Sequence, residues 1–131
     1  MLVFVRRQRY RRELRIVKTE KLVDLKGGLK RTTSSAQIKS DGSLVIELYD
    51  FSSEAEKWLG NEVAFLLKVF PRDKSKMLSC LLEGQKQMLD ESQEDDLLLQ
   101  VIGERFTDYY DVKQWMDENK IPYEKEFDPW A

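Results

Sequence analysis

Residues 36–51, AQIKSDGSLVIELYDF, carry the pattern that decides the fold. Asp41-Gly42 is a dipeptide typical of tight hairpin turns, and it stands between two runs rich in apolar residues. In the second run every other residue is aliphatic, as expected for a strand with one buried face: Leu44, Ile46 and Leu48. The stretch therefore predicts an antiparallel β-hairpin.

The next two segments predict a short helix and an inner strand. Ser53 and Glu56 have the spacing of a helix capping box, and Gly60 is suited to end that helix. Residues 62–70, EVAFLLKVF, are apolar on both faces of an extended strand. Such strands lie in the middle of a sheet that is covered on both sides.

Three further helices are predicted before the tail. The first runs from Pro71 through Glu83 and ends at Gly84, and Ser92 with Asp95 is suited to cap the second. The apolar residues of the second helix and of a shorter third helix recur at helical spacing: Leu98, Val101, Ile102, Phe106, Val112, Trp115 and Met116. The element order predicts an α+β fold, in which a small, mostly antiparallel sheet of about four strands packs against three to four helices.

The last eleven residues, IPYEKEFDPWA, also have the pattern of a strand. Their acidic residues Glu124 and Glu126 share one parity, and the apolar residues share the other: Ile121, Tyr123 and Phe127. We therefore expect the tail to close the sheet as an edge strand whose apolar face is buried against the core, with Trp130 over the rim of the core.

Charge divides the chain into two parts. Residues 1–31 carry eleven Lys and Arg against three acidic residues, a net charge of +8, whereas residues 32–131 carry eleven basic against twenty-one acidic residues, a net charge of −10. Such asymmetry is typical of a tail with a role of its own. We predict a basic N-terminal extension, residues 1–31, and a single acidic α+β domain, residues 32–131.

Three interpretations of the basic extension remain open. It could be an arm that binds nucleic acid through residues 6–31, because arginines neutralise phosphates: Arg6, Arg7, Arg9, Arg11, Arg12 and Arg15. It could instead be an unstructured or weakly docked extension. Finally, codons for Lys26-Gly27-Gly28 can resemble a bacterial ribosome-binding site, and translation would then start at Leu29.

Residues that enzymes use for acid–base and metal chemistry are scarce. The chain has no histidine, and its one cysteine, Cys80, lies in an apolar helical stretch where we expect a buried structural thiol. No phosphate-binding glycine loop is present. The acidic run 90–96 stands at a predicted helix N-terminus, where carboxylates interact favourably with the helix dipole. We predict a protein that is not an enzyme and uses no cofactor and no metal.

The sequence also argues against a membrane or secreted location. No apolar run approaches the ~20 residues of a membrane span. The short apolar start, MLVFV, precedes its basic cluster, which is the reverse of a secretory signal. We therefore expect a cytoplasmic protein with no membrane contact.

Four stretches resemble segments of a widespread group of small bacterial proteins: SDGSLVIELYDF, SSEAEKWLGNEVAFLLKV, LLLQVIGERF and VKQWMDENKIPYEKEFDPWA. In that group a strand pair leads to an acidic loop, a short helix that ends in an aromatic residue and glycine, and another strand. A W-[LM]-[DE]-E-x-x-I-P-[YF]-E tail closes the chain. The resemblance covers about residues 33–131, although the ending EFDPWA is more acidic than the EFW-type endings of the group. Most members are uncharacterised, and some are similar to immunity proteins, which bind and neutralise a cognate bacterial toxin.

These features predict a non-enzymatic protein-binding module, and the resemblance implies an immunity-type protein that occludes a cationic toxin or similar partner. An acidic surface would steer such a partner into the complex. The candidate partner-binding residues are acids with nearby aromatic side chains: Glu94, Asp95, Asp108, Tyr109, Tyr110, Asp111 and Trp58. We expect one tyrosine of the adjacent pair to lie in the core. The alternatives are a nucleic-acid-associated protein that uses the basic arm, and a small structural domain whose partner the sequence does not reveal.

Overall fold

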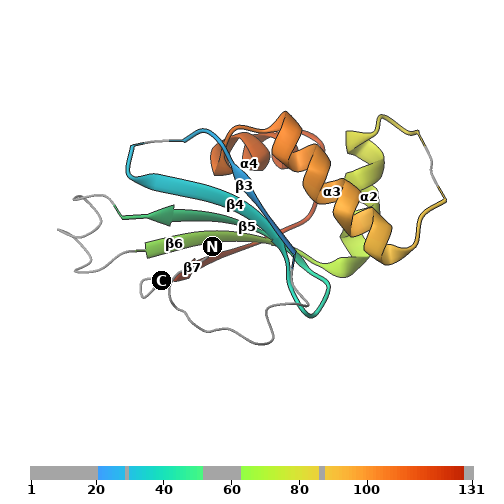
Figure 1. The fold of residues 1–131 in the computed structure, drawn as a ribbon, viewed down its shortest axis with the longest axis horizontal. Coiled ribbons are helices and arrows are strands. Elements are labelled where there is room, and N and C mark those ends of the chain that lie inside the picture. The colour runs from blue at the N-terminus through green and yellow to red at the C-terminus, as the bar shows by residue number, and fades with distance from the viewer. Residues whose placement is uncertain (1–20, 29, 52–62, 86–87, 129–131) are drawn as a thin grey trace.

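The computed structural model describes residues 21–28, 30–51, 63–85 and 88–128. Along the chain these residues form β3 (Lys21–Leu25), β4 (Thr32–Ile38), β5 (Leu44–Asp50), β6 (Val63–Val69), α2 (Pro71–Leu81), α3 (Glu91–Arg105), α4 (Tyr109–Glu118) and β7 (Glu124–Asp128). The strands form one antiparallel sheet in the order β3-β4-β5-β6-β7, with the three helices together on one side (Figure 1). The α+β prediction is confirmed, with five strands rather than four.

The predicted hairpin is formed by β4 and β5. The amide of Gly42 donates to the carbonyl of Lys39, and the amide of Lys39 donates to the carbonyl of Ser43, both at 2.9 Å. Gly42 has a φ of 88°, a conformation that glycine adopts without steric cost. Along β5 the three predicted aliphatic residues are fully buried on the helix side: Leu44, Ile46 and Leu48.

β6 is an inner strand, as predicted. It pairs with β5 on one side and β7 on the other, with Leu67 opposite Ile46 and Phe65 opposite Phe127. Leu67 is fully buried on the helix side. On the opposite face Ala64 is buried, but Leu66 and Lys68 are only half-buried and line an open hollow, so the predicted cover on both sides of the sheet is incomplete among the described residues.

β3 extends the sheet into the segment that the sequence analysis assigned to the basic extension. It pairs with β4 over its whole length, from Lys21 opposite Ile38 to Leu25 opposite Ser34. Leu25 is buried in the core. Part of the predicted extension therefore belongs to the folded sheet, and the boundary at residue 31 is too late. Arg6 to Arg15 lie outside the described residues.

Two helix boundaries differ from the prediction. α2 begins at Pro71, as expected, but ends at Leu81 because Gly84 turns the chain and donates its amide to the carbonyl of Ser79 at 2.9 Å. α3 is capped by Asp90 rather than by Ser92. The Asp90 carboxylate accepts from the amide of Gln93 at 2.7 Å, and the Gln93 side chain accepts from the amide of Asp90 at 3.0 Å, which completes a capping box.

The helices bury most of the predicted residues. The fully or nearly fully buried ones are Leu98, Ile102, Phe106, Val112, Trp115 and Met116. Cys80 differs from the prediction, because its side chain is half-buried at the margin of the core rather than enclosed. In the described part of the chain, no helix has the length and apolar character needed to cross a membrane.

The tail is an edge strand, but the cover predicted for its apolar face is incomplete. Ile121 is buried and Tyr123 is half-buried, whereas all five residues of β7 are exposed. Phe127 remains 48% exposed, because among the described elements β7 has extensive contact only with β6. The predicted burial of Phe127 is therefore wrong. The predicted helix at 52–60 and Trp130 lie outside the described residues.

Candidate functional site

The structure separates the predicted partner-binding residues into two groups. Glu94 and Asp95 lie near the start of α3, whereas the four residues 108–111 lie at the start of α4. The axis of α3 rises by roughly 16 Å between Glu94 and the helix end at Arg105. The two groups therefore do not form one continuous site. Trp58 lies outside the described residues.

Asp95 is a structural residue between two helices. Its carboxylate is 2.7 Å from the ammonium of Lys74 in α2, and both residues are at least nine-tenths buried. Glu91 lies 3.6 Å from the same ammonium. An ion pair this enclosed is not accessible to a partner, so Asp95 is not the surface acid that the sequence analysis proposed. Glu94, which is half-buried, accepts a long hydrogen bond from Ser75 at 3.4 Å.

Asp108 and Asp111 also have structural roles. The Asp108 carboxylate caps α4 by accepting from the amide of Asp111 at 2.9 Å. The Asp111 carboxylate accepts from the amide of Thr107 at 2.9 Å and thereby fixes the turn between α3 and α4. These contacts position the start of α4 on the sheet, where the Tyr109 amide donates to the hydroxyl of Ser34 at 3.0 Å.

The adjacent tyrosines divide between core and surface, as expected. Tyr109 is 6% exposed and belongs to the core, whereas Tyr110 is 49% exposed. Their rings meet edge to face with centroids 5.2 Å apart. Burial of Tyr109 raises the pKa of its phenol above the ordinary value. The exposed ring of Tyr110 is thus packed against the buried ring of Tyr109.

A polar network fixes the adjoining side of α4. Tyr109, Lys113 and Asp117 are spaced four residues apart and share one stripe of the helix. Tyr123, which precedes β7, donates its hydroxyl to Asp117 at 2.6 Å, and the Lys113 ammonium donates to the same carboxylate at 3.1 Å. These contacts attach the segment that leads into β7 to the outer side of α4.

The contacts within this network also shift the pKa values of its three side chains. The hydroxyl of Tyr123, and then the ammonium of Lys113, hold the pKa of Asp117 below its ordinary value. The pKa of Tyr123 is raised, first by partial burial and then by its bond to the carboxylate. Hydrogen bonding to Asp117 raises the pKa of Lys113. At neutral pH the network therefore holds one carboxylate, one ammonium and one phenol that donates a hydrogen bond.

Two phenylalanines lie where β6 and β7 pair. The rings of Phe65 and Phe127 have centroids 5.1 Å apart, and Phe65 packs against the core while Phe127 is half exposed. We call the exposed region formed by these two rings, Tyr110 and the network the α4–β7 surface, whose members are Phe65, Tyr110, Lys113, Asp117, Tyr123 and Phe127. The sequence analysis identified only Tyr110 among them as a binding residue.

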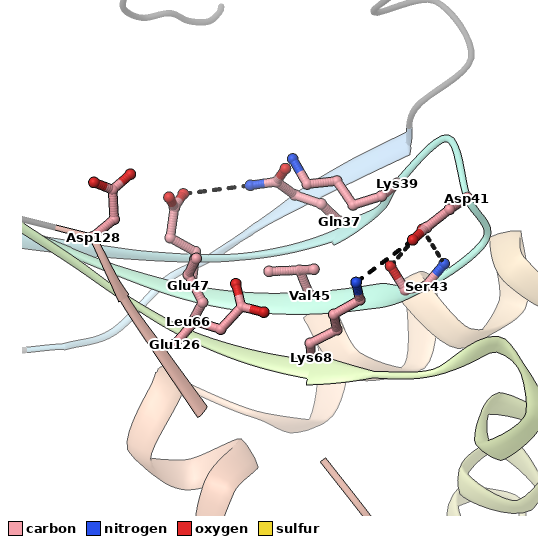
Figure 2. A pocket seen from close by; sticks show the side chains of 10 residues that line it. All are labelled: Gln37, Lys39, Asp41, Ser43, Val45, Glu47, Leu66, Lys68, Glu126 and Asp128. Atoms are coloured by element: carbon pink, nitrogen blue, oxygen red, sulfur yellow. Dashed lines mark hydrogen bonds and ion pairs between the residues drawn. The ribbon is translucent and has the colours of Figure 1, made fainter. Parts of the chain in front are cut away.

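The opposite face of the sheet carries a shallow hollow of about 290 Å³. In Figure 2 the side chains that line it come from β4, β5, β6, β7 and the turn between β4 and β5, on the side of the sheet away from the helices. Four of the lining residues are acidic and two are basic: Asp41, Glu47, Glu126, Asp128, Lys39 and Lys68. Lys68 lies 3.6 Å from Asp41, and the Gln37 amide donates to Glu47 at 3.4 Å. The hollow therefore has an acidic excess.

Two carboxylates of the hollow have local partners. No group of three or more His, Cys, Asp or Glu side chains in those ranges is arranged to hold a metal ion. The hydroxyl and amide of Ser43 hold the pKa of Asp41 below its ordinary value, so this carboxylate is ionised and bound within its own turn. Glu47 is partnered by Gln37.

Comparison with known proteins gave no match to a protein family, to a curated protein or to a solved structure. The resemblance to small bacterial immunity-type proteins therefore stays a prediction. The alternative nucleic-acid role depends on Arg6 to Arg15, for which the structure describes no geometry.

Proposed function

We propose that this protein is a non-enzymatic protein-binding module of the immunity type, which binds a cationic partner such as a bacterial toxin domain through the α4–β7 surface. The observation that carries the proposal is the exposure of two aromatic residues, Tyr110 at 49% on α4, which also carries Lys113 and Asp117 of the polar network, and Phe127 at 48% on β7, which follows Tyr123 of that network. Half-exposed aromatic side chains with rigid surroundings are typical anchors of protein interfaces.

The rigidity of this surface favours binding. Tyr110 rests on the buried ring of Tyr109, and Phe127 rests on Phe65. Side chains that are already ordered lose less conformational entropy when a partner arrives. The network of Lys113 and Asp117, on the same helix as Tyr110, and Tyr123, on the segment that leads to Phe127, offers an ammonium and a carboxylate to polar groups of a partner.

Charge supports a cationic partner. The helix-free side of β7 carries Glu124, Glu126 and Asp128, next to the acidic hollow. The chain from β3 onward, residues 21–131, carries fifteen basic and twenty-two acidic residues, a net charge of −7. Such a field accelerates encounter with a basic protein and repels nucleic acid. The complex would act by occlusion, with one module covering the active surface of one toxin domain in the cytoplasm.

The test is co-expression of the chain with the toxin domain encoded beside its gene, followed by titration calorimetry of the purified pair. We expect a one-to-one complex and rescued growth. Tyr110→Ala and Phe127→Ala should each weaken binding by about 30-fold, the factor that corresponds to a hot-spot loss of ~2 kcal/mol. Leu22→Ala is the matched control, because Leu22 is 58% exposed at the other edge of the sheet. Unchanged toxicity, or equal affinity in all three variants, would contradict the proposal.

A further inference from the structure

The outer edge of β7 offers backbone groups for pairing. β7 is the end strand of the described sheet, and its five residues are all exposed. Only its inner side is paired in the described part of the chain, with β6 from Glu124 opposite Lys68 to Asp128 opposite Ala64. An edge strand of this kind presents alternate N–H and C=O groups, to which another extended chain can add.

The two faces of β7 have different chemistry. Glu124, Glu126 and Asp128 share the helix-free face, where Glu126 lies opposite Leu66. Lys125 and Phe127 share the helix side, where Phe127 contacts Phe65. The acidic face continues inward to Glu47 across the hollow (Figure 2). A chain added to β7 would therefore meet carboxylates on one face and an aromatic ring on the other.

This pattern disfavours a second copy of the same chain. Two β7 strands related by a two-fold axis pair antiparallel and keep their faces, so acidic residues lie opposite acidic residues. With Glu126 opposite its own copy, Glu124 lies opposite Asp128, and shifts of two residues preserve this match. Like charges directly opposite each other destabilise a strand pair. A strand with basic residues at alternate positions has the opposite preference.

The other edge of the sheet is less suited to such an addition. α3 packs over β3 and β4, and Lys21 of β3 binds Asp96 of α3 at 2.8 Å. A strand added beside β3 would bring its helix-side residues against α3. Beside β7 no described helix has comparable contact.

We propose that the outer edge of β7 takes up an extended segment of the partner as an additional strand. This segment has Lys or Arg at every second position, facing Glu124 and Glu126, and apolar residues between them, next to Phe127. The inference rests on the proposed function, since it names the element of the cationic partner that the protein recognises. Backbone pairing supplies affinity, and the alternation of basic and apolar side chains supplies specificity.

The probe is a synthetic nine-residue peptide with arginine at alternate positions and valine between them, titrated into the ¹⁵N-labelled full chain. We expect amide shifts centred on residues 124–128. Two peptides with the same side chains, each N-methylated on one of the two alternating sets of residues, test the backbone bonds, because an added strand pairs through only one set. One of them should bind at least tenfold more weakly. Equal affinity of both and of the parent peptide would overturn the proposal, since charge alone would then explain binding.

Protein variants give an independent arm. Glu126→Lys should weaken binding of the parent peptide at least tenfold. Glu118→Lys makes the same charge change on α4 and is the matched control. An equal loss of affinity for the parent peptide in both variants would overturn the proposed strand addition. A second outcome would also overturn strand addition: Tyr110→Ala no longer binds the toxin, whereas Glu126→Lys binds it fully. In that case the proposed function would stand. Strand addition by the peptide without any toxin complex would support this inference and overturn the proposed function alone.

Discussion

The two edges of the sheet differ in what covers them. β3 lies beneath α3: Leu25 is buried, and Val23 fits against Gly103, where an added Cβ would come within 2.9 Å of Val23 Cγ2. At the opposite edge, β7 lies away from the helices and every one of its residues is exposed (Figure 1). Both strands are five residues long and pair fully with a neighbour, so hydrogen bonding to the sheet does not distinguish them.

The difference assigns separate tasks to the two edges. Burial of apolar side chains is the main stabilising term, so β3 contributes to the stability of the fold. β7 buries little, and its five residues, which include Glu124, Glu126 and Phe127, are exposed. These are the groups that the proposed partner would use.

Deleting residues 1–28 should destabilise the protein by about 3–5 kcal/mol, because it removes β3 with the buried side chain of Leu25 and the half-buried side chain of Val23, and a fully buried side chain of this size is worth ~1.5–3 kcal/mol. Truncation after Tyr123 removes β7 and should cost only about 1–2 kcal/mol, since its residues are exposed. Urea unfolding followed by circular dichroism measures both. Deletion of residues 1–20 is the control that isolates β3. If removal of β7 lowered the free energy of unfolding more than removal of β3, then β7 rather than β3 would be the edge strand that stabilises the fold.

Asp95→Ala should reduce stability by about 3 kcal/mol, because it leaves the Lys74 ammonium buried without its partner. This pair joins α2 to α3, the helix that covers β3. Replacing both partners by apolar residues, Lys74→Met with Asp95→Leu, should restore most of the loss. Thermal unfolding distinguishes the variants. If Asp95→Ala were as stable as the parent protein, other contacts would hold α3 in place.

Gly103→Ala should cost about 1 kcal/mol, since the methyl group meets Val23 at 2.9 Å and the strain exceeds the gain in helix propensity. In a Val23→Ala background the same substitution should become neutral or stabilising. Gln100→Ala, at an exposed position of the same helix, is the control. Absence of this coupling in the double-mutant cycle would mean that α3 does not pack closely on β3.

The smallest effect is expected on the β7 side, at Asp117. Its pKa in the folded state lies below the usual 3.8, so the network contributes stability above that value and loses it as pH falls through the folded pKa. Tyr123→Phe removes the largest cause of the shift and should raise the Asp117 midpoint in a ¹³C carboxyl titration. Glu118 provides an internal reference. An unchanged midpoint would show that Tyr123 does not bind the carboxylate in solution.

Local patterns predicted the elements that they themselves encode. The Asp41-Gly42 dipeptide predicted the hairpin of β4 and β5, and the alternation of Ile121, Tyr123 and Phe127 predicted the final strand. β3 was missed because KLVDL follows an arginine-rich stretch, and its pairing depends on Ala36 and on the space beside Gly103, which are distant in sequence.

The candidate site was less predictable, because exposure depends on tertiary contacts. Asp95 has the spacing of a surface acid, but Lys74 reaches it from another helix. Phe127 has the parity of a buried residue, but no described helix extends far enough to cover it. Tyr110 was identified, since a pair of tyrosines at a helix start places one ring inward and the other outward.

Amide hydrogen exchange of the full chain tests the contrast between the two edges most directly. We expect the β3 amides that bond to β4 to exchange only through global unfolding, as the core of the sheet does. The β7 amides that bond to β6 should exchange at least roughly tenfold faster through local opening, because few buried contacts hold that strand. Protection in β7 equal to or greater than that in β3 would contradict the account, because β7 would then be as firmly held as the core.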